Sequence, residues 1–166
     1  MVGIHIARAT PADVKTVVLI ERASFSDPWS ESSFRDVLNH QRIYFACARL
    51  SDESGQGSAA DVAGYVVAWF AGSEGEIANL AVDPSLRRQG IGAALLDAAL
   101  SEGRRLGTSD TYLEVRSSNL RARQLYESRG FVEVGRRRNY YRRPVEDAVI
   151  LRRTERVAAA QVEGDV

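Results

Sequence analysis

The sequence predicts one α/β domain (α+β by some schemes), in which a mixed, twisted sheet of about six to seven strands is flanked by about four helices. Three observations predict this fold. A chain of 166 residues suits one domain with a single sizeable core. Apolar residues alternate with polar ones in some segments and recur at helical spacing in others. The second half of the chain contains a strand–helix–strand unit, whereas the first half is rich in hairpins.

The first half of the chain is expected to form a strand, two helices and three more strands. The first helix start is well marked, because Thr10-Pro11-Ala12-Asp13 offers a capping hydroxyl, an early proline and an acid three residues after the cap. Asp27-Pro28-Trp29 ends this helix, and Ser30 can cap a second one. We expect strands at 4–8, 42–50, 62–70 and 76–82, helices at 10–24 and 30–38, a loose polar loop at 51–61 and a turn at 71–75.

In the second half, two helices are expected between three strands. An apolar stripe at helical spacing runs through Ile91, Ala94 and Leu95, and Gly107 and Gly130 suit the C-terminal ends of the two helices. We expect helices at 91–107 and 120–128, and strands at 111–116, 131–134 and 147–153. Residues 1–153 then form the domain, and residues 154–166 form a flexible C-terminal tail.

Composition excludes several classes of protein. Lysine plus arginine equals aspartate plus glutamate at 22 each, so no global charge favours nucleic acid or an anionic membrane. Cys47 is the single cysteine, which excludes an intramolecular disulfide, and its apolar surroundings favour a buried thiol over a nucleophile. The first residues are too short and polar for a signal peptide, and no apolar stretch could span a bilayer. We expect a cytoplasmic, monomeric protein without a metal and without membrane association.

The loop before the helix at 91–107 carries the first chemical signal. Gly90 and Gly92 lack a Cβ, so backbone N–H groups at this helix start can approach an anion closely, and Arg87 and Arg88 add donors. A phosphate or pyrophosphate site is therefore expected. A Walker loop would need a lysine and a hydroxyl after the glycines, and a dinucleotide fingerprint would need glycine where Leu95 stands. A tight turn that binds nothing is the alternative.

This loop resembles the Q/R-x-x-G-x-G/A signature of the GNAT family of N-acetyltransferases. It runs Arg87-Arg88-Gln89-Gly90-Ile91-Gly92 and follows Asn79-Leu80-Ala81-Val82-Asp83-Pro84, as in that family. The resemblance implies that the loop cradles the pyrophosphate of acetyl-CoA, that the preceding strand binds the pantetheine arm, and that the next strand splays away. It assigns acetyl-CoA binding to Leu80, Ala81, Val82, Arg88, Gln89, Gly90, Ile91, Gly92 and Ala93.

Acetyl transfer needs a proton acceptor for the amine and a donor for the departing sulfur. On the strand at 111–116, alternation places Glu114 on the face opposite Leu113, where a carboxylate could act directly or through water. Tyr126, on the following helix, has a phenol that can donate to sulfur. Taken alone, Glu114 suits a salt-bridged surface residue, Tyr126 a core residue, and Asn119 a helix cap.

A second resemblance bears on these residues. The chain from about 4 to 152 resembles the bacterial ribosomal-protein-alanine N-acetyltransferases, a branch of the GNAT family. The similarity rests on Pro28-Trp29-Ser30-Glu31, Leu113-Glu114-Val115-Arg116-Ser117-Ser118-Asn119, Leu125-Tyr126-Glu127 and Arg137-Arg138-Asn139-Tyr140-Tyr141. It implies that Glu114 is the general base, that Tyr126 is the general acid, that Asn119 contacts acetyl-CoA, and that Tyr140, Tyr141 and Trp29 bind the acceptor. The acceptor implied is a protein N-terminus, in particular the N-terminal alanine of a small-subunit ribosomal protein.

Two other functions stay open at this point. The same chemistry could act on a small-molecule amine or a lysine side chain, although a polycationic acceptor would want an acidic pocket, whereas this region offers arginines. The chain could instead be a non-catalytic module that docks on ribosomal RNA through an arginine cluster. That cluster is Arg136, Arg137, Arg138, Arg142 and Arg143. Arginine runs are weak motifs, and the glycine loop would then have no use.

Overall fold

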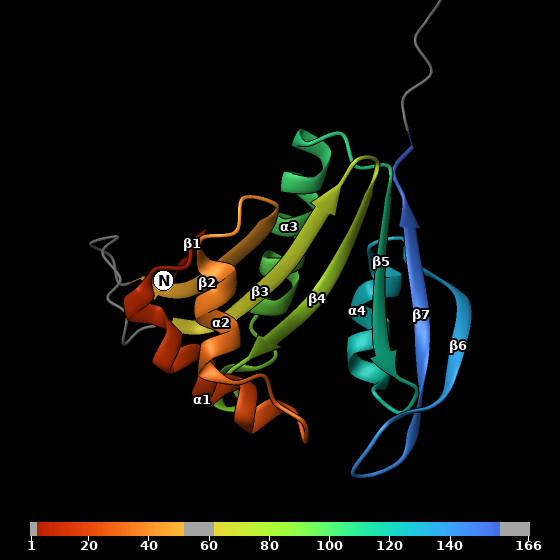
Figure 1. The fold of residues 1–166 in the computed structure, drawn as a ribbon, viewed down its shortest axis with the longest axis horizontal. Coiled ribbons are helices and arrows are strands. Elements are labelled where there is room, and N and C mark those ends of the chain that lie inside the picture. Colours follow the sequence, from red (N-terminus) through yellow and green to blue (C-terminus); the bar gives the residue numbers. More distant parts are fainter. Residues whose placement is uncertain (1–2, 52–61, 157–166) are drawn as a thin grey trace, which may run out of the picture.

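Seven strands form one sheet in residues 3–51 and 62–156, the part of the chain that the computed structural model describes (Figure 1). Their order in the sheet is β1-β2-β3-β4-β5-β7-β6, and all neighbours are antiparallel except β4 and β5. The strands are β1 Gly3–Arg8, β2 Ile43–Ser51, β3 Val62–Ala71, β4 Glu74–Val82, β5 Asp110–Arg116, β6 Val132–Tyr141 and β7 Glu146–Thr154.

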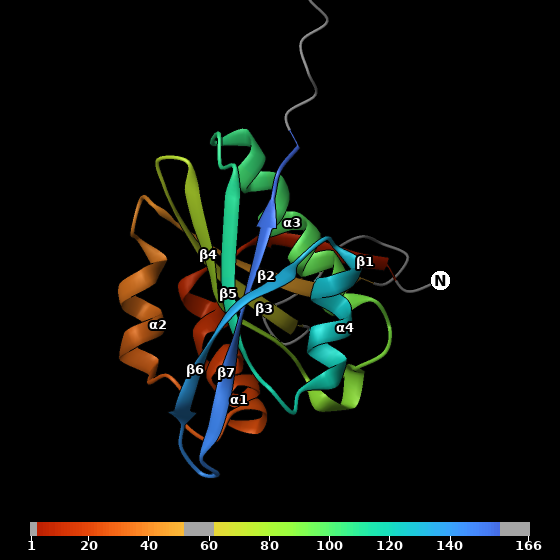
Figure 2. The same ribbon diagram turned by 90° about the vertical axis from the view of Figure 1, so that its right-hand side faces the viewer.

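Within the described residues, four α-helices cover the two faces of the sheet. They are α1 Val14–Ser24, α2 Glu31–Leu38, α3 Ile91–Arg105 and α4 Leu120–Ser128, with short 3-10 turns η1 Pro11–Asp13 and η3 Pro84–Leu86. Figure 2 shows α2 and α4 on opposite sides of the strands. Helices α1 and α2 pack on one face around Phe34 and Tyr65, whereas α3 and α4 pack on the other around Leu95, Leu96 and Phe131.

The sheet is split at the junction of its two parallel strands. Pairing of β4 with β5 runs from Glu74 opposite Asp110 to Ile77 opposite Leu113, and then stops. Beyond that point the two ribbons diverge in Figure 1. Residues 78–82 of β4 therefore present backbone N–H and C=O groups that β5 does not satisfy. The predicted splaying of the two strands is confirmed.

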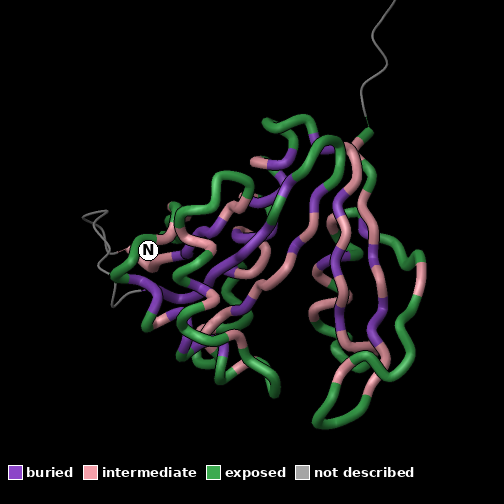
Figure 3. Tube along the Cα trace, viewed as in Figure 1, coloured by how far each residue is buried: buried purple, intermediate pink, exposed green. Residues whose placement is uncertain are grey.

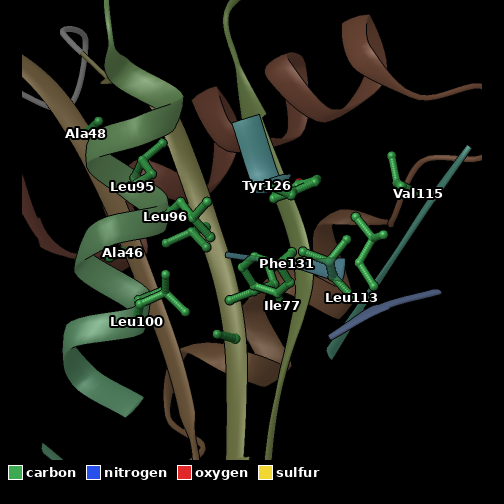
Figure 4. Close-up of a cluster of buried hydrophobic side chains, with 14 of the residues drawn as sticks. Ala46, Ala48, Ile77, Leu95, Leu96, Leu100, Leu113, Val115, Tyr126 and Phe131 are labelled. Carbon is green, nitrogen blue, oxygen red and sulfur yellow. The ribbon is translucent and has the colours of Figure 1, made fainter. Parts of the chain in front are cut away.

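One hydrophobic core holds the two parts of the sheet together. Ile77 of β4 and Leu113 of β5 belong to the same buried cluster as the apolar stripe of α3, and Figure 4 shows Tyr126 and Phe131 among them. In Figure 3 the buried positions run along the middle of the strands, while β6 is mostly exposed. Cys47 is fully buried, as expected, and burial raises the pKa of its thiol to about 12.

The predicted order of helices and strands is confirmed, but several boundaries were wrong. The largest error concerns β6, which was expected at 131–134 and extends to Tyr141. This edge strand is exposed almost throughout and shifts register twice against β7, so its sequence has no alternating apolar signal. Strand β4 starts at Glu74, two residues before the expected start, and β7 includes Thr154. Residues 52–61 of the expected loop and 157–166 of the expected tail lie outside the described residues.

Candidate active site

Helix α3 begins with free backbone donors. Gly90 is its N-cap, with a left-handed φ of +82° and no side-chain cap, and the first intrahelical bond runs from Ala94 N–H to the Gly90 carbonyl. The N–H groups of the three preceding helical residues, 91–93, therefore have no partner within the helix. Arg88 also has a positive φ, of 67°, and its side chain is exposed. This is the geometry of an anion site at a helix start.

The end of β4 that pairs with β3 but not with β5 lies beside this helix start. A Cβ built on Gly92 would lie 3.7 Å from Val82 and 3.9 Å from Leu80, and 3.5 Å from Leu125 of α4. Ala81 points to the opposite face, into the core under α1. The predicted cofactor residues of β4 and of the glycine loop are thus neighbours in space, and α4 borders them.

A hollow of about 180 Å³ lies on the α2 side of the sheet where β4 and β5 separate. Glu114 lines it together with Glu76, Tyr112, Leu113, Arg137 and Ile150. The Glu114 Oε1 atom lies 2.7 Å from Arg137 Nε, and the Glu114 side chain is 22% exposed. Glu114 is thus ion-paired, as the sequence predicts for this strand glutamate taken alone. It is also accessible where β4 and β5 separate.

Sequence reasoning missed the second carboxylate of this hollow, Glu76. Burial, followed by the negative charge of Glu114, raises the pKa of Glu76, and a hydrogen bond with Trp69 partly offsets the rise. Strand alternation was the available signal, since Glu76 must lie on the face opposite the buried Ile77. Its closeness to Glu114 depends on the pairing of β4 with β5, which the sequence does not display.

Two tyrosines lie beside Glu114, and a third adjoins them. Tyr140 is half-exposed and hydrogen-bonds with Glu114, whose negative charge is the main cause that raises the Tyr140 pKa. The pKa of Tyr141 is raised to about 12 by burial and then by the charge of Glu114. Tyr126 packs edge-on against Phe131, and burial and the neighbouring Tyr141 raise its pKa to about 12. Glu114, Tyr140 and Tyr141 therefore lie together, and Tyr126 adjoins this group through Tyr141.

The remaining predicted residues have structural partners. Asn119 caps α4, because its Oδ1 accepts a hydrogen bond from Ala122 N–H at 3.2 Å. Trp29 packs its ring against Phe34, with 5.4 Å between the ring centroids. Its backbone N–H donates to Glu21 Oε1 at 3.1 Å. Ile20-Glu21 also fits the resemblance, but no role was assigned to Glu21, which joins Trp29 to Asn79 of β4.

A larger hollow, of about 500 Å³, lies elsewhere and contains none of the predicted residues. It is lined by Arg129, Gly130, Val132, Arg152, Arg153, Thr154, Glu155 and Arg156. Two of its arginines are neutralised, Arg129 by Asp97 and Arg153 by Glu155. It shares no residue with the glycine loop or with the Glu114 hollow, so size alone does not make it the active site.

Neither a metal centre nor a membrane span is evident in residues 3–51 and 62–156. No three His, Cys, Asp or Glu side chains in these ranges are grouped as metal ligands would be. None of the helices described there is both long and apolar enough to cross a bilayer.

Comparison with known proteins places this geometry among acetyltransferases. The model of the acetyltransferase (GNAT) family matches residues 14–131. The [ribosomal protein bS18]-alanine N-acetyltransferase of Escherichia coli strain K12 is 35% identical over 143 residues, which cover 84% of this chain and 89% of that protein. The enzyme of the same name from Salmonella typhimurium is 34% identical over 141 residues, with 84% and 89% covered.

Solved structures agree with these relatives. The crystal structure of the ribosomal-protein-S18-alanine N-acetyltransferase from Escherichia coli matches with a TM-score of 0.81 and 31% identity, covering 96% of this chain and 99% of that one. The structure of Ard1 from Thermoplasma volcanium matches with a TM-score of 0.80 and 27% identity, covering 93% and 99%.

Proposed function

Because the chain belongs to the acetyltransferase (GNAT) family, we propose that it moves an acetyl group from acetyl-CoA to the N-terminal α-amine of a protein. One observation carries the proposal. The split between β4 and β5 puts a hollow containing Glu114 next to an unpaired strand edge that leads to the free amides of α3. An acceptor amine would need the carboxylate of Glu114, and a phosphorylated thioester would need the strand edge and the free amides.

The residues around the split fit acetyl-CoA, which would supply an activated acetyl group as a thioester. The left-handed Gly90 and the free N–H groups after it suit a pyrophosphate. Backbone groups of 80–82 on the unpaired edge can hydrogen-bond the amides of a pantetheine arm as a neighbouring strand would. Asn119 uses Oδ1 as a helix cap, which leaves its amide N–H groups for a ligand.

Glu114 is proposed as the general base. A protein α-amine has a pKa near 8, so it is largely protonated at neutral pH and must lose a proton before it attacks. Glu114 lies in an accessible hollow with an oxygen that an incoming ammonium could reach. Its present partner, Arg137, is 55% exposed, and exposed ion pairs are weak, so an acceptor amine can displace this guanidinium at little cost.

Tyr126 is proposed as the general acid. Because burial raises its pKa to about 12, the phenol keeps its proton throughout the physiological range. An ordinary thiol has a pKa near 8.5, so complete transfer of the phenolic proton to a departing thiolate would be uphill. Tyr126 therefore acts chiefly by donating a hydrogen bond to the sulfur. Tyr140, Tyr141 and Trp29 are proposed to hold the backbone of the acceptor.

The acceptor is proposed from the names of the relatives. Two proteins at 34–35% identity are named for acetylation of alanine on ribosomal protein bS18. We propose the N-terminal alanine of a small-subunit ribosomal protein, and hence action in the cytoplasm, where ribosomes are assembled. An RNA-docking function is disfavoured because Arg136 pairs with Glu133 and Arg137 with Glu114, which reduces the positive charge available to phosphates.

Single-turnover acetylation of an alanine-initiated peptide tests the catalytic assignment. General bases contribute about 100-fold or more, so Glu114→Gln should lower the rate by at least that factor at pH 7 while acetyl-CoA affinity is kept. Tyr126→Phe should also slow the step. The control is Glu133→Gln, because Glu133 pairs with Arg136 at 2.6 Å much as Glu114 pairs with Arg137. A rate like that of the wild type in Glu114→Gln would remove Glu114 from the mechanism and make Glu76 the next candidate.

A further inference from the structure

Arg116 follows Glu114 by two residues on β5, so its side chain leaves the same face of the sheet, about 7 Å further along the strand. Its guanidinium donates from Nη2 to Ser26 Oγ at 3.0 Å and to the Arg142 carbonyl at 3.1 Å. From Nη1 it donates to the Pro144 carbonyl at 3.1 Å. Most of the N–H donors of this guanidinium are therefore engaged in hydrogen bonds at the same time.

These contacts tie together two segments that are remote in sequence. Ser26 belongs to the connection 25–30 between α1 and α2, which also carries Trp29. Arg142 and Pro144 belong to the turn 142–145 between β6 and β7. Ser26 Oγ itself donates to the Arg142 carbonyl at 3.3 Å, across 116 positions of sequence. Arg116 and Ser26 thus form a clasp between the two segments.

Arg116 also holds an aromatic side chain. Its Cζ atom lies 4.5 Å from the centre of the Tyr141 ring, in a cation–π contact. Its Nη1 lies 3.4 Å from Glu146 Oε2, and the other oxygen of Glu146 accepts the Ser118 N–H at 2.7 Å. Tyr141 is thereby fixed beside Glu114, at the point where the hairpin of β6 and β7 meets the end of β5.

We propose that Arg116 is a positioning residue that clasps the α1–α2 connection to the β6–β7 turn and so preorganises the two sides of the acceptor site. The inference rests on the proposed function, since it assigns the hollow beside Glu114 to the acceptor. A planar guanidinium serves four oxygens and a ring face at the same time, which the single ammonium of lysine cannot do. A preorganised site spends less binding free energy on ordering its loops.

The Arg116 side chain acts on the acceptor side, whereas its backbone carbonyl, which any Arg116 variant keeps, accepts the Asn119 N–H at 3.0 Å. None of the atoms bonded to Arg116 belongs to the glycine loop or to residues 80–82. Its loss should therefore raise the KM for the acceptor peptide while the KM for acetyl-CoA is unchanged. Glu114 and Tyr126 are not bonded to it, so kcat should change much less than the peptide KM.

The test compares Arg116→Lys with the matched control Arg123→Lys. Arg123 is similarly buried and also donates to a backbone carbonyl, that of Ser117 at 3.0 Å. Arg116→Lys should raise the peptide KM about tenfold or more, because peptide binding would then have to order the α1–α2 connection and the β6–β7 turn. Ser26→Ala, which removes one contact, should raise it by about two- to threefold. Arg123→Lys should leave the peptide KM near that of the wild type.

Hydrogen exchange of the free protein provides a readout that needs no acceptor. Arg116→Lys should speed exchange at 25–30 and 141–146 and leave α3 unchanged. Unchanged exchange in both segments, or an equal rise in the KM for peptide and for acetyl-CoA, would overturn the clasp. If wild-type protein acetylates no peptide N-terminus, the proposed function fails instead, and the exchange result still decides whether Arg116 holds the two segments.

Discussion

At the scale of single residues, Glu21 shows how a buried carboxyl links the α1–α2 connection to β4. Its side chain is 1% exposed, and its Oε1 accepts from Trp29 N–H at 3.1 Å and from Asn79 Nδ2 at 2.9 Å. Trp29 lies in the α1–α2 connection, and Asn79 lies on the part of β4 that does not pair with β5. Burial outweighs these two hydrogen bonds and raises the pKa of Glu21 to about 7.

This shifted pKa predicts a dependence of stability on pH. The unfolded chain releases the Glu21 proton near pH 4.5, whereas the folded protein keeps it up to about pH 7. Between these values the folded state binds more protons, so the free energy of unfolding falls as pH rises, by up to roughly 3 kcal/mol. Glu21→Gln keeps the Oε1 acceptor and removes the titration. Urea unfolding from pH 4.5 to 8 should show a flatter profile for Glu21→Gln, and equal slopes would refute the assignment.

At the scale of elements, the glycines that flank the two ends of α3 have similar backbone conformations. Gly90 precedes the helix with a φ of +82°, and Gly107 follows it with a φ of +85°. A Cβ at either position would meet nothing within 4 Å. Alanine would therefore bring the same kind of left-handed strain at both ends and no steric clash. Only the N-terminal end lies at the unpaired edge of β4.

This pair of glycines permits a matched test of the anion site. Gly90→Ala and Gly107→Ala should each lower the free energy of unfolding by about 1–2 kcal/mol, the cost of a left-handed non-glycine residue. Only Gly90→Ala should weaken acetyl-CoA binding, by about tenfold or more, because strain relief would redirect the N–H groups of the loop. Calorimetric titration with acetyl-CoA measures the difference, and equal affinities in both variants would argue against a phosphate site at this helix.

At the scale of the whole molecule, a sheet that is split between β4 and β5 must still fold as one unit. Only four residue pairs join β4 to β5. The core compensates, because one buried cluster contains Ala46 and Val66 from the first part of the sheet and Leu113 and Leu151 from the second. The backbone is therefore open between β4 and β5, while the buried side chains of the same junction join the two parts of the sheet.

Truncation of Leu151 tests this cooperativity. Leu151 is 1% exposed, and removal of a buried leucine side chain costs about 2–5 kcal/mol. Both tryptophans, Trp29 and Trp69, lie on the other side of the split. Leu151→Ala should still lower the midpoint of urea unfolding followed by tryptophan fluorescence, whereas Leu106→Ala, at an exposed position, should have little effect. An unchanged fluorescence midpoint in Leu151→Ala would mean that the two parts unfold separately.

Much of the fold and the site could be predicted because the signals are local. Ser30 accepts the Ser33 N–H as a helix cap, and Gly107 and Gly130 adopt positive φ beyond α3 and α4, as their positions implied. The glycine loop and the motif around Glu114 are continuous stretches of sequence, so a short-range pattern is enough to identify them. Their catalytic and binding roles remain predictions for the experiments above.

By itself, the sequence determined which segments become helices and strands, because caps, glycines and alternation act over a few neighbouring positions. Which residues could carry acyl-transfer chemistry followed from its resemblance to the GNAT family. Only the tertiary structure decided where β4 leaves β5, how far β6 extends, and that Glu76 and Arg137 face Glu114. It alone joined Ser26 to Arg142 through Arg116. The physical reason is that strand pairing and side-chain contacts across distant segments depend on the packing of the whole chain, which no local pattern encodes.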